Sequence, residues 1–114
     1  MTEVKLHVET LDEMGARVAE TWRRAERGEI TQTERSLSFG SLETLMKVLT
    51  PKRYHLLRHL HAHPAASIAA LARDLGRDYK RVHEDVEALT AAGLIDRDHG
   101  LTAPYDVIEA RMAM

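Results

Sequence analysis

Hydrophobic residues recur with a helical period in five segments of this 114-residue chain, and they alternate with polar residues in several shorter ones. The clearest helical pair lies between residues 67 and 94. In its first segment, apolar residues at i, i+3, i+4 and i+7 place one face of a helix toward a core. These residues are Ile68, Leu71, Ala72 and Leu75. In the second segment, 78–91, they are Val82, Val86 and Leu89.

Residues that start or stop helices mark the ends of this pair. Ser67 is a good N-cap because its hydroxyl can accept a free amide of the first turn. Gly76 follows the last apolar residue of the first helix, where a left-handed residue is favoured. Asp78 can cap the second helix, and Gly93 ends it, with Leu94 folding back onto the last turn. The pattern therefore predicts a helix-turn-helix.

The first 50 residues predict the order strand, helix, strand, helix. Alternating apolar and polar residues indicate a strand around residues 4–8. A helix over residues 10–27 is indicated by a capping box of Thr10 and Glu13 and by an apolar stripe. The stripe consists of Leu11, Met14, Val18 and Trp22. At this spacing we interpret Trp22 as a core residue or a dimer contact.

A polar loop over residues 29–34 is predicted to lead into a second strand at Leu37 and Phe39. Ser41 then caps a short helix, whose apolar residues are Leu42, Leu45, Met46 and Leu49. So short a segment can hardly bury a core alone. We therefore expect its stripes to pack on the second half of the chain, on a second copy or on another protein. Our hypothesis is that residues 1–50 carry the interface of a homodimer.

The remaining elements surround the helix-turn-helix. Thr50 and Pro51 open a helix that Pro64 closes. Two strand-like runs around the glycine turn at residues 98–100 predict a β-hairpin, which in this position would be a wing. The apolar residues Tyr105, Val107 and Ile108 predict a last strand, which can pair with an N-terminal strand.

Composition narrows the classes of protein. No apolar run approaches the ~18 residues that span a membrane, and the N-terminus shows no signal pattern. We therefore expect a cytoplasmic protein with no membrane partner.

Because the chain has no cysteine, disulfides and thiolate metal sites are excluded. His55 and His59 have an i, i+4 spacing that suits zinc, but no third ligand converges, so we interpret them as solvated histidines or as neighbours of a phosphate.

No catalytic pattern is present in the sequence. A glycine-rich phosphate loop, a nucleophile elbow and a pair of carboxylates are all missing. We therefore expect neither an enzyme nor a cofactor.

Charge is distributed unevenly along the chain. Residues 1–50 carry a net charge of −2, residues 51–83 carry +5 and residues 84–114 carry −5. The positive block covers the helix-turn-helix and the helix before it, as an electrostatic footprint for phosphate does. The alternative is that the blocks mix in space and the patch disappears.

In the second helix of the pair, the N-terminal half is basic and is predicted to face solvent. At 100° per residue, Lys80 points almost opposite Val82, with His83 and Glu84 beside it. A recognition helix presents this half to the major groove. The candidate DNA-binding residues are Ser67, Arg73, Arg77, Tyr79, Lys80, Arg81, His83, Glu84 and Arg97. The alternative is an ordinary helical hairpin with a solvated basic face.

Two of these candidates have competing interpretations of their own. Arg97 either reaches a phosphate or the minor groove, or belongs to a hairpin that never contacts DNA. Glu84 either accepts from a cytosine amino group or only orients Lys80 or Arg81.

Residues 51–103 resemble a winged helix-turn-helix domain of the MarR and ArsR kind. The matching stretches are TPKRYHLLRHL, SIAALARDLGRDYKRVHEDVEAL and AAGLIDRDHGLT. The whole chain resembles a group of small prokaryotic DNA-binding regulators, some of them antitoxins encoded beside toxin genes. The resemblance implies that helix 78–91 enters the major groove and that the turn 97–100 is the wing tip. The long flanking helices of MarR proteins and the cysteines of many ArsR proteins are missing, so drug-like ligand sensing and thiolate metal sensing are not expected.

The sequence thus predicts a mainly α, α+β fold, a winged helix-turn-helix with an N-terminal strand-helix-strand-helix extension. The expected divisions are an extension over 1–50, a DNA-binding domain over 51–105 and a C-terminal strand or tail over 106–114. The expected function is a homodimeric transcriptional regulator that binds double-stranded DNA and represses its own promoter. Two alternatives remain. One is an antitoxin that neutralises a toxin protein, and the other is a winged helix used for RNA or for protein contacts.

Overall fold

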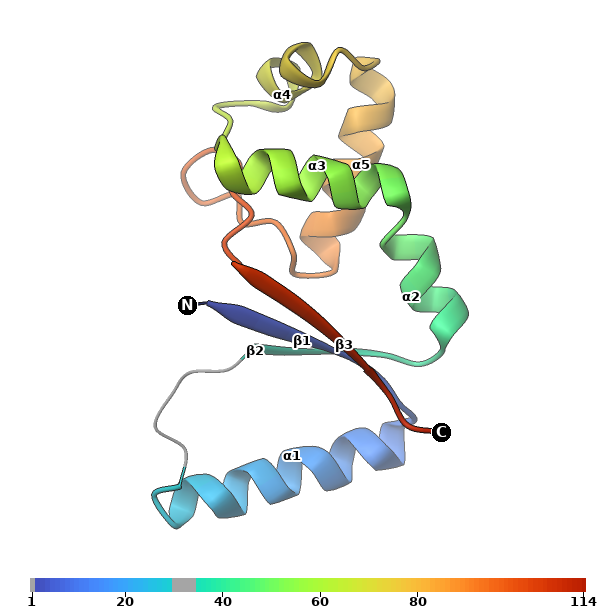
Figure 1. The fold of residues 1–114 in the computed structure, drawn as a ribbon, viewed down its shortest axis with the longest axis vertical. Helices are drawn as coiled ribbons and strands as arrows, with labels where there is room; N and C mark the ends of the chain where they lie inside the picture. Colours follow the sequence, from blue (N-terminus) through green and yellow to red (C-terminus); the bar gives the residue numbers. More distant parts are fainter. Residues whose placement is uncertain (1, 30–34) are drawn as a thin grey trace.

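The computed structural model describes residues 2–29 and 35–114, whose arrangement Figure 1 shows. In these ranges the chain forms five α-helices and three β-strands, so the expected α+β class is confirmed. The elements are β1 (Glu3–Val8), α1 (Leu11–Glu26), β2 (Arg35–Phe39), α2 (Leu42–Val48), α3 (Pro51–Ala62), α4 (Ile68–Leu75), α5 (Tyr79–Ala91) and β3 (Val107–Met112). None of the helices in the described ranges is long and apolar enough to cross a membrane.

The first 50 residues adopt the predicted order of strand, helix, strand and helix. Both helices begin at the predicted caps, since the hydroxyls of Thr10 and Ser41 accept the backbone amides of Glu13 and Thr44. The loop predicted for residues 29–34 lies, from residue 30 onward, outside the described residues.

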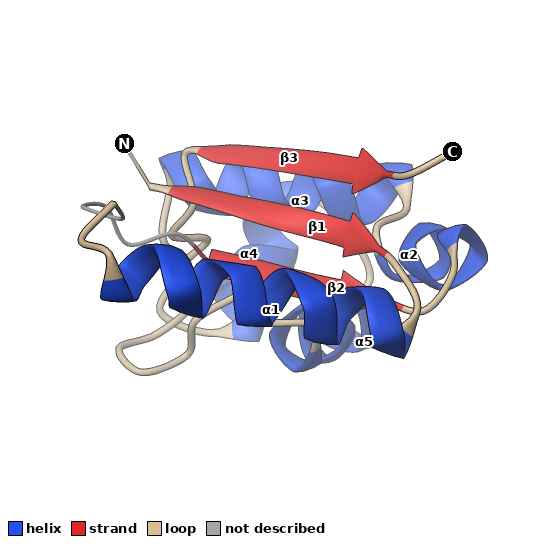
Figure 2. Ribbon diagram, turned by 90° about the horizontal axis from the view of Figure 1, so that it is seen from below, coloured by secondary structure: helices blue, strands red, loops and turns tan. Residues whose placement is uncertain are grey.

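The three strands form one parallel sheet with the order β2-β1-β3 (Figure 2). In its central strand, Leu6 lies opposite Leu37 of β2 and Ala110 of β3. The predicted pairing of the last strand with an N-terminal strand is therefore confirmed. The sheet joins the two ends of the chain, because β3 comes from the last residues and β1 from the first.

The two faces of the sheet differ in polarity. The inner face carries the buried Val4, Leu6 and Phe39, and it lies toward α2 and α3 (Figure 1). The opposite, outer face carries mostly polar residues, among them Lys5 and Glu109, which lie opposite each other in the register. Helix α1 connects β1 to β2 as a crossover and lies on the outer side of the sheet (Figure 2).

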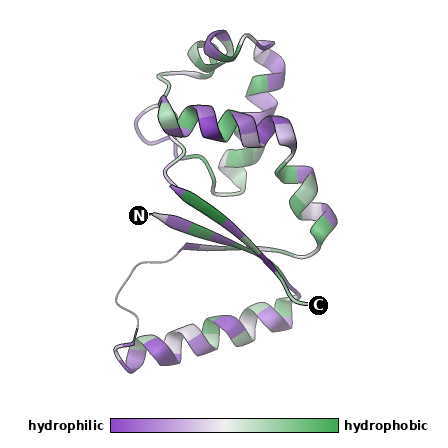
Figure 3. Cartoon of the chain, in the orientation of Figure 1, coloured by the Kyte–Doolittle hydropathy of each residue, from purple (hydrophilic) through white to green (hydrophobic). Residues whose placement is uncertain are grey.

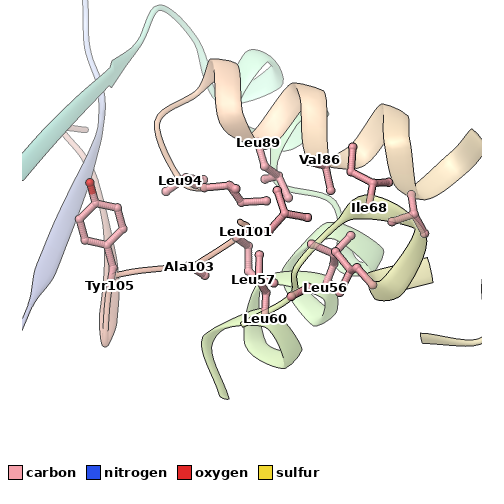
Figure 4. Close-up of a cluster of buried hydrophobic side chains, with 14 of the residues drawn as sticks. Leu56, Leu57, Leu60, Ile68, Val86, Leu89, Leu94, Leu101, Ala103 and Tyr105 are labelled. Atoms are coloured by element: carbon pink, nitrogen blue, oxygen red, sulfur yellow. The ribbon is translucent and has the colours of Figure 1, made fainter. Parts of the chain in front are cut away.

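The main core lies among the helices of residues 51–105, which we call the head. Leu56, Leu60, Leu71, Val86 and Leu89 are at most 1% exposed there, and Figure 4 shows several of these side chains converging. The local signals that predicted these helices are confirmed. The side chains of Thr50, Ser67 and Asp78 cap α3, α4 and α5, respectively. Gly76 ends α4 with a φ of +63°.

The predicted hairpin after α5 is present in a shorter form. Only one bridge, between Asp96 and Thr102, joins its two arms among the described residues. The second arm also pairs with the segment before α4, because Ala65 and Leu101 exchange backbone hydrogen bonds of 3.0 and 2.8 Å. Gly100 is required at this contact, because it has a φ of +85° and an added Cβ would lie 2.7 Å from the Ala65 oxygen.

Helix α1 forms as predicted, but its apolar stripe is not covered. None of its residues is buried, and Leu11, Val18 and Trp22 are 77%, 54% and 68% exposed. Figure 3 shows hydrophobic positions on α1 although this helix lies apart from the head. The interpretation of Trp22 as a core residue is therefore wrong within a single chain, where its indole Nε1 donates to the Glu26 carboxylate at 2.6 Å. The alternative of a dimer contact stays a prediction.

Candidate nucleic-acid interface

One side of α5 carries core residues and the other side carries polar residues. Val82, Val86 and Leu89 are 0% exposed and hold the helix on the head. On the other side, Tyr79 is 53% exposed, and Lys80 and Arg81 are exposed beside it. The helix therefore presents its N-terminal half to solvent, as the 3.6-residue period predicted.

Two cations on this exposed half remain available for a ligand. Among the described residues, Lys80 and Arg81 have no ion-pair partner, and the same holds for Arg73 on α4. Glu84 is also exposed and forms no hydrogen bond or ion pair with Lys80 or Arg81 in this structure. The Tyr79 and His83 rings lie 6.0 Å apart on the same helix. Lys80 and Arg81 thus form an adjacent pair of exposed cations without an ion-pair partner at the start of α5.

Arg77, another predicted contact, is held inside the protein. Its guanidinium donates to the Asp85 carboxylate at 2.8 Å, and Arg53 of α3 donates to the same carboxylate at 2.9 Å. Arg53 also donates to the carbonyls of Lys47 and Val48 at the end of α2. With its side chain 23% exposed, Arg77 fixes the start of α5 against α3 rather than standing free.

Arg97 of the hairpin is also engaged. It donates to the Glu87 carboxylate of α5 at 2.8 Å, and His83 Nε2 lies 3.7 Å from the same carboxylate. These side chains are 41% to 52% exposed, so the contacts are weak and solvent-screened. Arg97 is therefore docked on α5.

A hollow of about 450 Å³ brings together three separate elements of the predicted site. It lies between the start of α4, the start of α5 and the hairpin, and its lining includes Ser67, Tyr79, Arg97 and Gly100. The Ser67 hydroxyl accepts the amide of Ala70 at 3.1 Å and so caps α4 at the edge of this hollow. The structure thus places Ser67 and Arg97, which are distant in sequence, on one surface with Tyr79.

The role of Asp85 was missed in the sequence, although a signal was present. Asp85 follows Val82 by three residues and precedes Leu89 by four, so it lies on the buried face of α5. Its side chain is 13% exposed. A carboxylate on a buried face needs a partner, and the sequence offered Arg53 and Arg77 for that purpose.

The charge blocks of the sequence partly mix in space. Asp85 of the acidic block pairs with Arg53 and Arg77 of the basic block, whereas Glu87 pairs with Arg97 of its own block. The exposed positive charge is therefore smaller than the sequence block predicted. It includes Lys80 and Arg81 at the start of α5, together with Lys52, Arg58 and Arg73 on α3 and α4.

The histidines of α3 do not form a metal centre. His55 packs near Tyr54, and His59 lies near His63 with its Nε2 3.9 Å from Asp74. Within residues 2–29 and 35–114, no group of three or more His, Cys, Asp or Glu is placed to hold a metal ion.

These features define a class: an α+β protein whose helical head presents the basic start of one helix beside a shallow hollow. Residues 48–110 match the sequence profile of the HVO_A0114 family, which is more than half of the chain. The chain therefore belongs to the HVO_A0114 family. The matched range contains the whole head and most of β3. No curated protein and no solved structure matches the chain significantly.

Proposed function

We propose that this protein is a sequence-specific regulator of transcription that binds double-stranded DNA through a winged helix-turn-helix. Helix α4, the turn at Gly76 and helix α5 form the helix-turn-helix in this proposal, and the hairpin over residues 94–103 is the wing. The observation that supports it most directly is the pair of exposed, unpaired cations Lys80 and Arg81 at the start of α5. In such motifs the start of the second helix contacts bases and phosphates in the major groove.

The other polar groups of this surface have separate roles in the proposal. Ser67 and Arg73 on α4, together with Arg97 on the hairpin, contact the sugar-phosphate backbone, which fixes position without reading sequence. Tyr79 and His83 flank the groove contacts, and Glu84 can accept from a cytosine amino group. Arg77 positions α5 through Asp85. Two copies of the chain would place their two α5 helices on the two half-sites of one operator. By binding that operator, the protein represses its own promoter.

Fluorescence anisotropy with labelled duplexes tests this function. The purified chain is titrated with DNA from upstream of its own gene, with an unrelated duplex and with a single strand, over a series of salt concentrations. We expect tight, salt-dependent binding that prefers the upstream duplex. The double variant Lys80→Ala/Arg81→Ala should lower the salt slope by about 0.9 for each phosphate that it no longer neutralises. If either side chain reads a base, its removal should cost ~1–3 kcal/mol at that position of the operator.

A matched control removes two positive charges elsewhere. Arg23 and Arg24 lie in the last turn of α1, and Arg23→Ala/Arg24→Ala changes the net charge by the same amount. This control should bind like the unaltered protein. Equal weakening in both double variants would mean that only overall charge matters. Equal affinity for single strands, or no duplex binding at low salt, would contradict the proposal.

One observation favours a second function, that of an antitoxin that binds and neutralises a toxin protein. The exposed stripe of Leu11, Val18 and Trp22 on α1 can be covered by a protein partner. Co-purification of a neighbour-encoded protein with the unaltered chain, and its absence with Trp22→Ala, would support this function. If the chain purifies alone and binds DNA as described above, the regulator remains the better account.

A further inference from the structure

We propose that β3 pairs with the β3 strand of a second copy, antiparallel about a two-fold axis at Ala110. This inference deepens the proposed function, since it names the dimer surface that a two-site operator needs. It differs from the sequence hypothesis, which placed the interface in residues 1–50. The two three-stranded sheets would then join into one continuous sheet.

Strand β3 is an open edge of the sheet. Within the described part of the chain, β1 is the only strand that pairs with it. Val107 and Met112 are 36% and 48% exposed along it, and no proline interrupts residues 107–112. A six-residue edge strand without proline, lysine or bulge is a ready template for another strand.

The backbone hydrogen bonds show which groups face outward on this edge. The Val107 amide donates to the Thr2 carbonyl at 3.2 Å, so the peptide groups of Val107 point toward β1. Because the direction alternates along a strand, the N–H and C=O groups of Ile108, Ala110 and Met112 point away from β1. An axis at Ala110 therefore gives hydrogen-bonded pairs between the two Ala110 residues and between Ile108 and Met112 of the second copy.

The charges of β3 select this register among the alternatives. An axis at Ala110 places Glu109 opposite Arg111 of the second copy, and each ion pair occurs twice by symmetry. These residues form non-hydrogen-bonded pairs, in which Cα atoms are only about 4.5 Å apart and side chains are closest. An axis at Glu109 or at Arg111 would instead place like charges opposite each other. In the single chain, neither residue forms an ion pair with any described group.

The apolar residues of the edge fit the same register. Ile108 and Met112 share the inner face of the sheet with Val4 and Val8, their partners on β1. Pairing would place Met112 against Ile108 of the second copy and would cover its exposed surface. Ala110 lies at the axis, where the side chains of the two copies face each other directly, and a methyl group fits there without collision.

The resulting dimer agrees with the proposed DNA contact. A two-fold axis that joins sheet edges in this way is perpendicular to the sheet, so each face of the sheet stays on one side of the dimer. The heads lie on the inner side in Figure 1, opposite to α1. Both copies of α5 would therefore lie on the same side of the dimer, where one duplex can reach both.

Sedimentation velocity without DNA tests the interface separately from DNA binding. The unaltered chain should dimerise. Glu109→Arg and Arg111→Glu should each weaken dimerisation by roughly tenfold or more, since each creates two like-charge contacts. The double exchange Glu109→Arg/Arg111→Glu restores opposite charges and should restore dimerisation. A monomeric unaltered chain, or single variants that dimerise normally, would overturn the proposal.

Disulfide formation locates the axis without disturbing the charges. The chain has no cysteine, so Ala110→Cys introduces a single thiol. In a hydrogen-bonded pair the Cα atoms lie about 5.5 Å apart, within the range that a disulfide spans. Ala110→Cys should oxidise to a covalent dimer, whereas Ala19→Cys on exposed α1 should remain monomeric on a denaturing gel. Rapid cross-linking of Ala19→Cys and none of Ala110→Cys would place the interface on α1 and overturn the proposal.

Discussion

Helices α1 and α5 have similar sequence patterns and different surroundings. Each begins at a side-chain cap and has an apolar stripe with charged residues around it. On α5 the stripe residues Val82, Val86 and Leu89 are fully buried, whereas on α1 Trp22 is 68% exposed. An amphipathic period therefore predicts a helix with an apolar face but not the molecule that covers that face.

The interactions that hold the two helices on the rest of the chain also differ. Helix α5 is held by the apolar core and by the Asp85 ion pairs. Helix α1 is held near its start by a polar clamp, in which Arg17 donates to both carboxylate oxygens of Glu9 at 2.6 to 3.2 Å. A cleft of about 510 Å³, lined by His7, Glu9, Arg17 and Arg111 among others, lies between the first half of α1 and the ends of β1 and β3. Burial of apolar surface therefore stabilises the head far more than it stabilises α1.

The largest effect is expected when the same substitution, Leu to Ala, is made in the head and in α1. Leu60 is 0% exposed in the head and Leu11 is 77% exposed on α1. Leu60→Ala should lower the free energy of unfolding by about 2–5 kcal/mol, and Leu11→Ala should change it by less than about 0.5 kcal/mol. Urea unfolding at a protein concentration that keeps the chain monomeric measures both. Equal losses of stability would show that α1 is packed as firmly as the head.

A smaller effect is expected from two glycines with left-handed backbone. Gly100 and Gly28 have φ values of +85° and +72°, but only at Gly100 would an added Cβ meet another atom within 4 Å. Gly100→Ala should therefore cost about 2 kcal/mol or more, since strain and a backbone collision combine. Gly28→Ala at the end of α1 should cost less, about 1–2 kcal/mol, because only the backbone strain remains. Thermal unfolding of the two variants compares them, and a larger destabilisation at Gly28 would contradict the assigned hairpin contact.

The smallest effect concerns pH and the cleft beneath α1. Burial lowers the pKa of His7 below its ordinary value of 6.5, and the Arg17 guanidinium lowers it further; Arg111 and Lys5 act in the same direction, and Glu9 opposes them. Because the unfolded chain then binds the proton more readily, stability should rise with pH between the lowered pKa and 6.5. Below the lowered pKa, no further change is expected from this group.

Chemical unfolding at about pH 7.5 and about pH 5.5 measures this dependence. His7→Gln should lose less stability on acidification than the unaltered chain does. The control His55→Gln removes an exposed histidine of α3 and should retain the loss of stability on acidification that His7 causes. The same pH dependence in His7→Gln and in the unaltered chain would show that α1 does not bury His7 in solution.

Neighbouring residues in the sequence were enough to specify the local structure of this protein. The caps at Thr10, Ser67 and Asp78, and the stop at Gly76, act over one helical turn, so their residues specify the ends of the helices wherever these pack. The 3.6-residue period likewise specified which side of α5 faces solvent. For the same reason, the exposure of Lys80 and Arg81 could be predicted without a structure.

The meeting of distant groups, in contrast, depended on the folded chain. Arg77 and Arg97 both looked like free cations, yet Asp85 and Glu87 of α5 hold them, because ion pairs form between groups that the fold brings within a few ångströms. The parallel order β2-β1-β3 and the open edge at β3 also emerged only at this level, since strand pairing joins residues from opposite ends of the chain. Periodicity is a property of neighbouring residues, whereas burial and pairing depend on what the folded chain places beside them.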